Sequence, residues 1–171
     1  MPLLKNGTLA ADPWHKIVNG EPLPPDGSVI LPFERWRAER ESLLGRNTPL
    51  GVRLSNTHSV AELEPVLDRL EVIVLEFPKF TDGRAYSQAR LLRERFGYRG
   101  ELRATGHVLR DQLLHMNRAG FDAFEIARDD AAEVFAKALA SLSVFYQPTG
   151  DGRVTARDLR LRNLFGKEAA E

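Results

Sequence analysis

Val72-Ile-Val-Leu-Glu76, with the turn Phe77-Pro-Lys-Phe-Thr-Asp-Gly-Arg84 that follows it, is the stretch that decides the fold. Its first four residues are apolar and mostly β-branched, as in a strand buried on both faces of a parallel sheet. After the turn, apolar residues recur at the helical spacing i, i+4, i+7 and i+11: Ala85, Ala89, Leu92 and Phe96. The stretch therefore predicts a central strand, a loop and a helix that packs on the sheet.

The same alternation of a short apolar run and a helical stretch recurs along the chain. Five such runs predict strands: Val29–Leu31, Gly51–Ser55, Val72–Glu76, Glu101–Ala104 and Ala123–Ile126. This rhythm is typical of an α/β fold with about five mainly parallel strands that alternate with helices. A closed barrel of eight such units needs about 250 residues, and this chain has 171. We therefore expect an open sheet or an incomplete β/α barrel.

The length suits a single domain over residues 1–171. Residues 1–28 are predicted to form an N-terminal edge segment, either irregular or a small hairpin, because Asn6-Gly7 between apolar residues favours a tight turn. Residues 29–146 form the α/β body. Residues 147–171 form a C-terminal tail, for which a docking helix, an extra strand and an interaction arm all remain open.

Composition excludes several kinds of chemistry. The chain has 24 basic and 24 acidic residues and no cysteine. The balanced charge gives no case for nucleic-acid or membrane binding. Without thiols there is no disulfide, no Cys-based redox pair and no thiolate-bound zinc or iron–sulfur cluster. The N-terminus lacks a signal-peptide pattern and no apolar run approaches the length of a membrane helix, so we expect a cytoplasmic protein.

Side chains suited to binding an anion and moving protons follow two neighbouring predicted strands. Lys79, Asp82 and Arg84 lie in the loop after the third strand, Arg103 lies within the fourth, and His107 directly follows it. The carboxyl ends of parallel strands form one rim where ligands bind, so we expect these five residues to share it. Lys79, Arg84 and Arg103 would bind an anion, whereas His107 and Asp82 are the candidate catalytic residues.

A purely structural interpretation of these residues stands beside the functional one. In the loop, Asp82 would cap the helix and Arg84 would pair with a nearby carboxylate. On the strand, Glu101 and Arg103 would form a structural ion pair with the Arg-rich helix. The sequence has no glycine-rich phosphate motif and no paired-histidine metal motif, so we expect no cofactor and no metal.

Arg110 and Asp111 fall in the first turns of the next predicted helix, where they face partly outward. They predict a surface for a partner protein or a homodimer seam, with an ordinary solvated face as the alternative.

Several multi-residue motifs identify a family. The run Phe77–Phe96, together with Gly100-Glu-Leu-Arg-Ala-Thr-Gly106 and Val108-Leu-Arg-Asp-Gln112, resembles the DUF934 family of small bacterial proteins, described as putative oxidoreductases of sulfite reduction. The family usually has Asp where this chain has His107, which puts any role of that Asp in doubt here.

The resemblance implies a pathway and leaves open whether the protein is an enzyme. One expectation is an accessory protein of assimilatory sulfate and sulfite reduction, in cysteine biosynthesis, that acts with sulfite reductase or its electron donor. The alternative is an oxidoreductase or other enzyme that binds an anionic sulfur metabolite at the rim of the sheet. Absence of cysteine favours the accessory role, because most means of carrying electrons are missing.

Overall fold

The computed structural model describes residues 2–168, with side chains up to residue 164. This part of the chain forms one eight-stranded sheet with the order β2-β1-β8-β7-β6-β5-β4-β3. The strands are β1 (Leu3–Lys5), β2 (Thr8–Ala10), β3 (His15–Lys16), β4 (Val29–Pro32), β5 (Leu50–Leu54), β6 (Val72–Phe77), β7 (Glu101–Gly106) and β8 (Ala123–Glu125). The α/β class is confirmed. The expectation of about five strands is wrong, because the N-terminal segment adds three.

The helices follow the strands along the chain. They are α1 (Phe33–Ala38), α2 (Arg40–Leu44), the 3-10 helix η1 (Val60–Arg69), α3 (Arg84–Arg90) with its π-helical extension η2 (Leu91–Arg95), the 3-10 turn η3 (Arg110–Gln112), α4 (Leu113–Arg118), α5 (Ala131–Ala140) and α6 (Ala156–Glu168).

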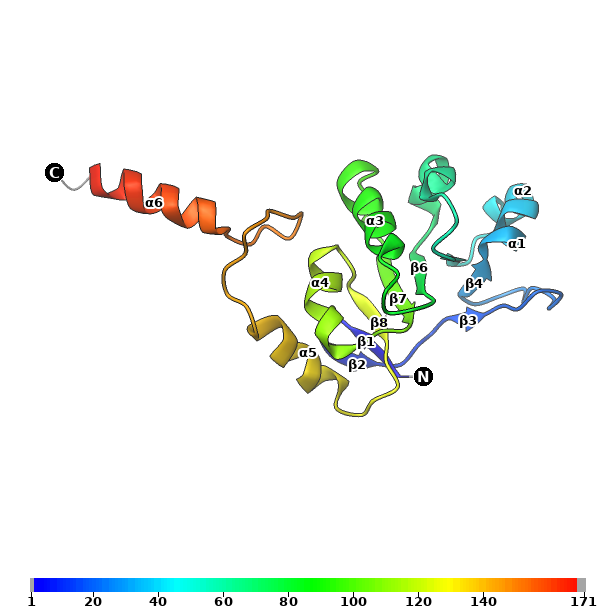
Figure 1. Ribbon diagram of the computed structural model, residues 1–171. Helices are drawn as coiled ribbons and strands as arrows, with labels where there is room; N and C mark the ends of the chain where they lie inside the picture. The colour runs from blue at the N-terminus through cyan, green and yellow to red at the C-terminus, as the bar shows by residue number, and fades with distance from the viewer. Residues whose placement is uncertain (1, 169–171) are drawn as a thin grey trace.

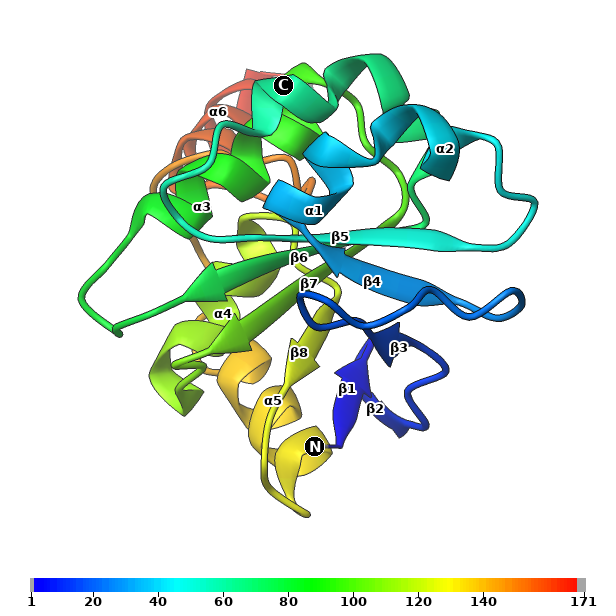
Figure 2. The same ribbon diagram turned by 90° about the vertical axis from the view of Figure 1, so that its right-hand side faces the viewer.

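Strands β3 to β8 are parallel and lie side by side in chain order. Each parallel strand from β4 to β8 lies beside the strand that precedes it in the chain. Connections between such strands are right-handed, so the helices between β4 and β8 all cover the same face of the sheet (Figure 1). The sheet curls away from them (Figure 2). The curl brings Lys16 of β3 within 2.7 Å of Glu125 of β8, across the inner face.

Strand β6 is buried on both faces, as predicted. Residues Val72 to Leu75 are at most 2% exposed. Ile73 and Leu75 belong to the large core between sheet and helices, whereas Val72 and Val74 pack on the inner face with Ile30 and Trp14.

The N-terminal segment forms a hairpin, one of the two expected alternatives. Asn6 (φ 50°) and Gly7 (φ 82°) occupy the left-handed conformations of a tight hairpin turn. The hairpin joins the sheet through β1, which is antiparallel to β8, and this leaves β2 at one edge and β3 at the other.

The tail contains the helix α6 over Ala156–Glu168, so an extra strand over these residues is wrong, whereas a docking helix and an interaction arm both stay open. Figure 1 shows α6 pointing away from the sheet and from the helices that cover it.

Gly106, the last residue of β7, is required by a close backbone contact. Its φ is +90°, and a Cβ there would lie 2.4 Å from the carbonyl oxygen of Phe77. Gly27 has nearly the same φ, +93°, with nothing within 4 Å of its missing Cβ. The two glycines therefore have the same left-handed backbone conformation, but only at Gly106 would an added Cβ collide with a neighbouring atom.

We predict that Gly106→Ala destabilises the fold more than Gly27→Ala. The control should lose about 1–2 kcal/mol from its left-handed backbone, and Gly106→Ala about 1–3 kcal/mol more, because the contact with Phe77 must open. Urea unfolding of both variants measures the difference. Equal losses would show that the β6–β7 contact is not tight.

Candidate functional site

The carboxyl ends of the parallel strands meet at one rim, where loops from several parts of the chain converge. The loop after β5 contains Ser55 to His58, the loop after β6 contains Lys79 and Asp82, and His107 directly follows β7. In parallel α/β folds this end of the sheet binds ligands.

Asp82 lies at the centre of a compact polar cluster on this rim. Its carboxylate accepts hydrogen bonds from Arg84 Nε at 3.0 Å, Arg84 Nη2 at 2.7 Å and Asn56 Nδ2 at 2.6 Å. It also accepts the backbone N–H of Arg84, the first residue of α3. Hydrogen bonds from the Arg84 side chain and backbone, more than any other cause, lower the pKa of Asp82 to about 2. Asp82 is therefore ionised near neutral pH and poorly suited to the proton transfer predicted for it.

A second cluster holds the turn after β5 in place. The backbone N–H of Ser55 donates to His58 Nδ1 at 3.2 Å, so a neutral His58 carries its proton on Nε2, which faces Glu34 Oε1 at 3.2 Å. The buried Gln88 of α3 donates through Nε2 to the carbonyl oxygens of Ser55 and His58 at 2.9 and 2.8 Å. The ring of His58 stacks on Phe33.

This turn contains a hydroxyl, an imidazole and a carboxylate in series. Ser55 Oγ lies 3.3 Å from His58 Nδ1, and Glu34 contacts the other ring nitrogen. Such a series resembles the arrangement that activates a nucleophile. Here the backbone N–H of Ser55 already occupies the Nδ1 lone pair, so the imidazole is not free to take the hydroxyl proton.

Arg103 lies on the inner face of the sheet with its side chain fully buried. It contacts three carboxylates: Asp12 at 2.8 and 3.2 Å, Glu101 at 2.7 and 2.8 Å, and Glu125 at 3.3 Å. These contacts match the five N–H donors of a guanidinium. The predicted ion pair between this strand and the Arg-rich helix is wrong, because Glu101 and Arg103 point to the face of the sheet opposite the helices.

Two lysines complete the inner-face network. Lys5 pairs with Glu101 and Lys16 with Glu125, both at 2.7 Å, so three cations balance three carboxylates. Burial favours a raised pKa for Glu125, but hydrogen bonds from Lys16, Thr105 and Arg103 outweigh it, and the pKa of Glu125 is lowered. Its ionised form therefore stabilises the fold above its usual pKa of 4.5, and this contribution is lost as the pH falls through the lowered value.

Cavities near the rim are small, and the larger ones lie elsewhere. A cavity of about 40 Å³ lies above the network, beside Lys16, Arg53, Thr105 and Glu125, with room for water rather than for a metabolite. A hollow of about 470 Å³ lies at the opposite, amino ends of the strands; among its lining residues, Arg93 pairs with Asp122 and Arg118 with Asp151.

The structure brings Lys79, Asp82, Arg84 and His107 to one end of the sheet but not into one cluster. Lys79 and His107 are exposed, and the backbone N–H of His107 donates to the carbonyl oxygen of Phe77 at 2.8 Å. Arg84 forms its ion pair with Asp82, so the structural alternative for this loop matches the geometry. Arg103 faces the interior.

The predicted partner surface lies on η3. Arg110 and Asp111 are exposed beside a groove of about 450 Å³ between α4 and α5. Gln112 connects two rim loops, since its Nε2 donates to the carbonyl oxygen of Phe80 at 3.0 Å.

Sequence analysis missed several residues that organise this end of the molecule: Asp12, Lys16, Glu34, Asn56, Gln88 and Glu125. A signal existed for one of them. Gln88 lies beside Ala85, Ala89 and Leu92 on the buried side of α3, and a polar residue on such a face requires a hydrogen-bond partner. The others act through contacts between distant segments.

No group of three His, Asp or Glu side chains within the described residues could hold a metal ion. None of the helices in residues 2–168 is long and apolar enough to cross a membrane.

We predict that Arg103→Met destabilises the protein by about 3–5 kcal/mol, because the buried Glu101 and Glu125 and the partly buried Asp12 lose their shared partner. Arg53→Met is the matched control, since Arg53 lies at the same level of the sheet, is half exposed and pairs with Glu76; it should cost less than about 1 kcal/mol. Chemical unfolding measures both. Similar losses would show that the network does not hold the inner face together.

We predict that Arg84→Met raises the pKa of Asp82 from about 2 toward the usual 3.8, because the main hydrogen bonds that stabilise the carboxylate are lost. Arg90→Met, which removes the pairing partner of Glu94 on the same helical segment, should leave it unchanged. Carboxyl-detected NMR titration gives both values. A pKa unaffected by Arg84→Met would mean that Asp82 is held by other groups.

The sequence model of the family described as bacterial proteins of unknown function (DUF934) matches residues 51–157, which span β5 to the start of α6 and include Asp82, Arg84 and Asn56 but not Glu34 or Phe33. No curated protein matches the sequence. Since the match covers more than half of the 171 residues, the chain belongs to the DUF934 family.

Proposed function

We propose that the chain is a cytoplasmic accessory protein of assimilatory sulfate and sulfite reduction, which acts with sulfite reductase or its electron donor in cysteine biosynthesis. The pathway rests on the resemblance of the Phe77–Phe96 and Gly100–Gly106 motifs to proteins described in that context. The choice of an accessory role over catalysis rests on the residues themselves.

The observation that supports an accessory role is that the best candidate anion-binding cations are already paired. Arg103 places all its donors on three carboxylates, and Arg84 binds Asp82 through two nitrogens. Sulfite at either position would compete with a carboxylate held at short distance. Of the three cations, Lys79 alone is exposed with no ion pair to the described residues, and one lysine is a weak anion site.

The lack of cysteine adds to this argument. Reduction of sulfite requires six electrons, and the chain has no thiol pair and no thiolate to ligate an iron centre. An accessory protein needs neither.

The alternative function is an oxidoreductase or other enzyme that binds an anionic sulfur metabolite at the rim. The exposure of Lys79 and His107 on neighbouring loops favours this alternative. An oxidoreductase of this kind would borrow its redox cofactor from another protein.

We predict that a deletion strain grows poorly on sulfate or sulfite and normally on cysteine, and that the wild-type gene restores growth. Normal growth of the deletion strain on sulfate would remove the pathway assignment.

Biochemistry separates the two candidate functions. The accessory role predicts co-purification with the sulfite reductase complex and no shift of the melting temperature with sulfite, sulfate, phosphate, flavin or nicotinamide nucleotides. Reduction of sulfite by the pure protein with a nicotinamide donor would overturn the accessory role in favour of the enzyme.

A further inference from the structure

Helix α6 begins at a base, the residues around Thr155, that specific hydrogen bonds hold in place. Thr155 and Asp158 form a reciprocal cap: Thr155 N–H and Oγ1 donate to Asp158 Oδ2 at 2.9 and 2.7 Å, and Asp158 N–H contacts Thr155 Oγ1 at 3.3 Å. Such a cap supplies partners for the first N–H groups of a helix. Thr155 is only 4% exposed and bridges to the buried Phe145.

Arg118 of α4 fastens this base to the body. Its Nε lies 2.9 Å from Asp151 Oδ2, its Nη2 donates to the carbonyl oxygen of Gln147 at 2.8 Å, and its guanidinium stacks on Phe145 at 3.8 Å from the ring centroid. Cation–π contact and a partly buried ion pair together fix the segment that leads into α6. The direction in which the helix leaves the body is therefore set by specific contacts.

Beyond this base, none of the α6 side chains described, up to residue 164, belongs to the hydrophobic core or packs against it. It projects from the rest of the fold (Figure 1), and Leu159, Leu161 and Leu164 are 38%, 38% and 64% exposed. An isolated helix of this length is marginally stable in water. A fixed base that presents a poorly supported helix with exposed leucines is typical of a segment that binds a partner.

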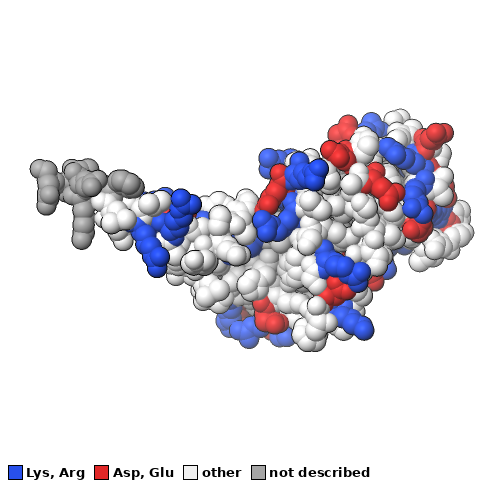
Figure 3. All heavy atoms as spheres, turned by 45° about the horizontal axis from the view of Figure 1, so that its top comes forward, with Lys and Arg blue, Asp and Glu red and all other residues white. Residues whose placement is uncertain are grey.

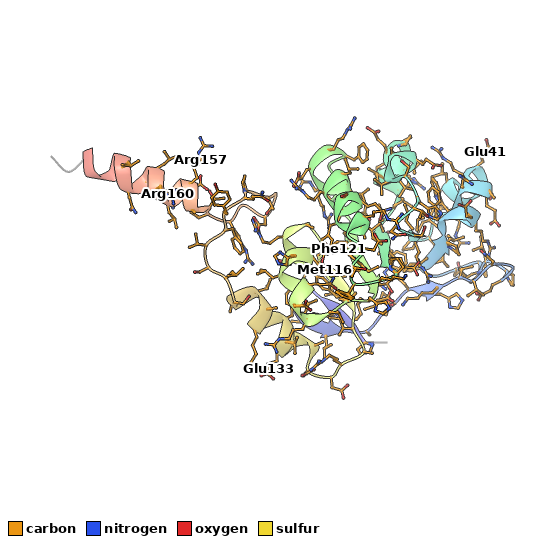
Figure 4. All side chains as sticks on the ribbon, viewed as in Figure 1. Glu41, Met116, Phe121, Glu133, Arg157 and Arg160 are labelled. Carbon is orange, nitrogen blue, oxygen red and sulfur yellow. The ribbon has the colours of Figure 1, made fainter. Side chains whose placement is uncertain are left out.

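One face of α6 combines basic and apolar side chains. Arg157, Arg160, Leu161 and Leu164 follow the spacing i, i+3, i+4 and i+7, which places them on one side of a helix. Lys and Arg side chains gather on α6 in Figure 3, and Figure 4 shows Arg157 and Arg160 directed away from the body. Leu159 and Arg162 lie on the opposite side, by the same helical geometry.

We propose that α6 docks through this face into an apolar groove bordered by carboxylates on a partner protein. The leucines would enter the groove, and Arg157 and Arg160 would pair with its acidic border, the helix-in-groove mode of recognition. The inference rests on the proposed accessory role and adds the chemistry of the partner: an acidic surface on sulfite reductase or on its electron donor.

Other occupants fit the same face less well. A membrane helix separates a wide apolar face from its basic face, whereas here arginines and leucines share one side. Nucleic acid would not require the exposed leucines. A second copy of the chain offers the apolar Leu91, but the carboxylate beside it, Glu94, is already paired with Arg90, and Arg95 adds a further positive charge that would repel Arg157 and Arg160.

The test uses the full-length protein and two pairs of matched variants, with purified sulfite reductase and its electron donor as probes. Leu161→Asp and Leu159→Asp replace leucines of equal exposure, 38%, on opposite sides of α6. Arg160→Glu and Arg162→Glu reverse equal charges in the same way. Because α6 does not pack on the core, the melting temperature of the body should stay unchanged in all four.

We predict that Leu161→Asp weakens binding at least 10-fold while Leu159→Asp stays within about 2-fold of the wild type. Arg160→Glu should weaken binding and flatten its salt dependence, and Arg162→Glu should do neither. Equal effects within each pair would overturn docking through this face. Binding of anionic lipid vesicles or of DNA that depends on Leu161 would overturn the acidic protein groove as the target.

The outcomes also separate this inference from the proposed function. If wild type and all four variants bind the reductase or its donor equally, the accessory role stands and docking by α6 is wrong. If the wild type binds neither probe while the deletion strain still requires cysteine, docking is wrong and the pathway stands. If the deletion strain grows normally on sulfate and the wild type binds neither probe, both are wrong.

Discussion

The fold depends on a buried guanidinium held between carboxylates from three segments of the chain. Arg103 of β7 joins Glu125 of β8 and Asp12, which lies between β2 and β3. Removing Arg103 would leave the buried carboxylates Glu101 and Glu125 without their shared partner. The network therefore ties the N-terminal segment, through Asp12, to strands β7 and β8. On the inner face of the curled sheet, ion pairs add to the packing of apolar side chains.

The rim is organised by a similar principle on a smaller scale. Gln88 donates hydrogen bonds to the carbonyl oxygens of Ser55 and His58, and Asp82 accepts a hydrogen bond from the side chain of Asn56. These contacts hold the loop after β5 against α3. Each contact satisfies a polar group that would otherwise be partly buried without a partner. The loops at the carboxyl ends of the strands are thus prearranged, but most of their charged groups are used to hold one another.

Most charges that form ion pairs and most exposed groups of α6 lie in different parts of the molecule. On the inner face and around Asp82, charges neutralise each other, whereas the described side chains of α6 expose arginines and leucines. Binding energy comes from groups that gain partners on association. Helix α6 is therefore the part of the described molecule that can gain most contacts when it binds a partner. This supports the proposal that the protein acts by binding another protein.

Strand and helix periodicity are local, so the sequence alone predicted the α/β class, the positions of strands β4 to β8 and the buried position of Val72 to Leu75. The full count of eight strands, the curl of the sheet and the partners of Arg103 depend on contacts between distant segments and emerge only in the tertiary structure. Asp12 and Arg103 are 91 residues apart, and no local pattern specifies which distant carboxylate meets a buried cation. Periodicity also does not specify which side chains of a strand face away from the helices. Arg103 faces away from them, and it therefore lies in the interior instead of on the rim.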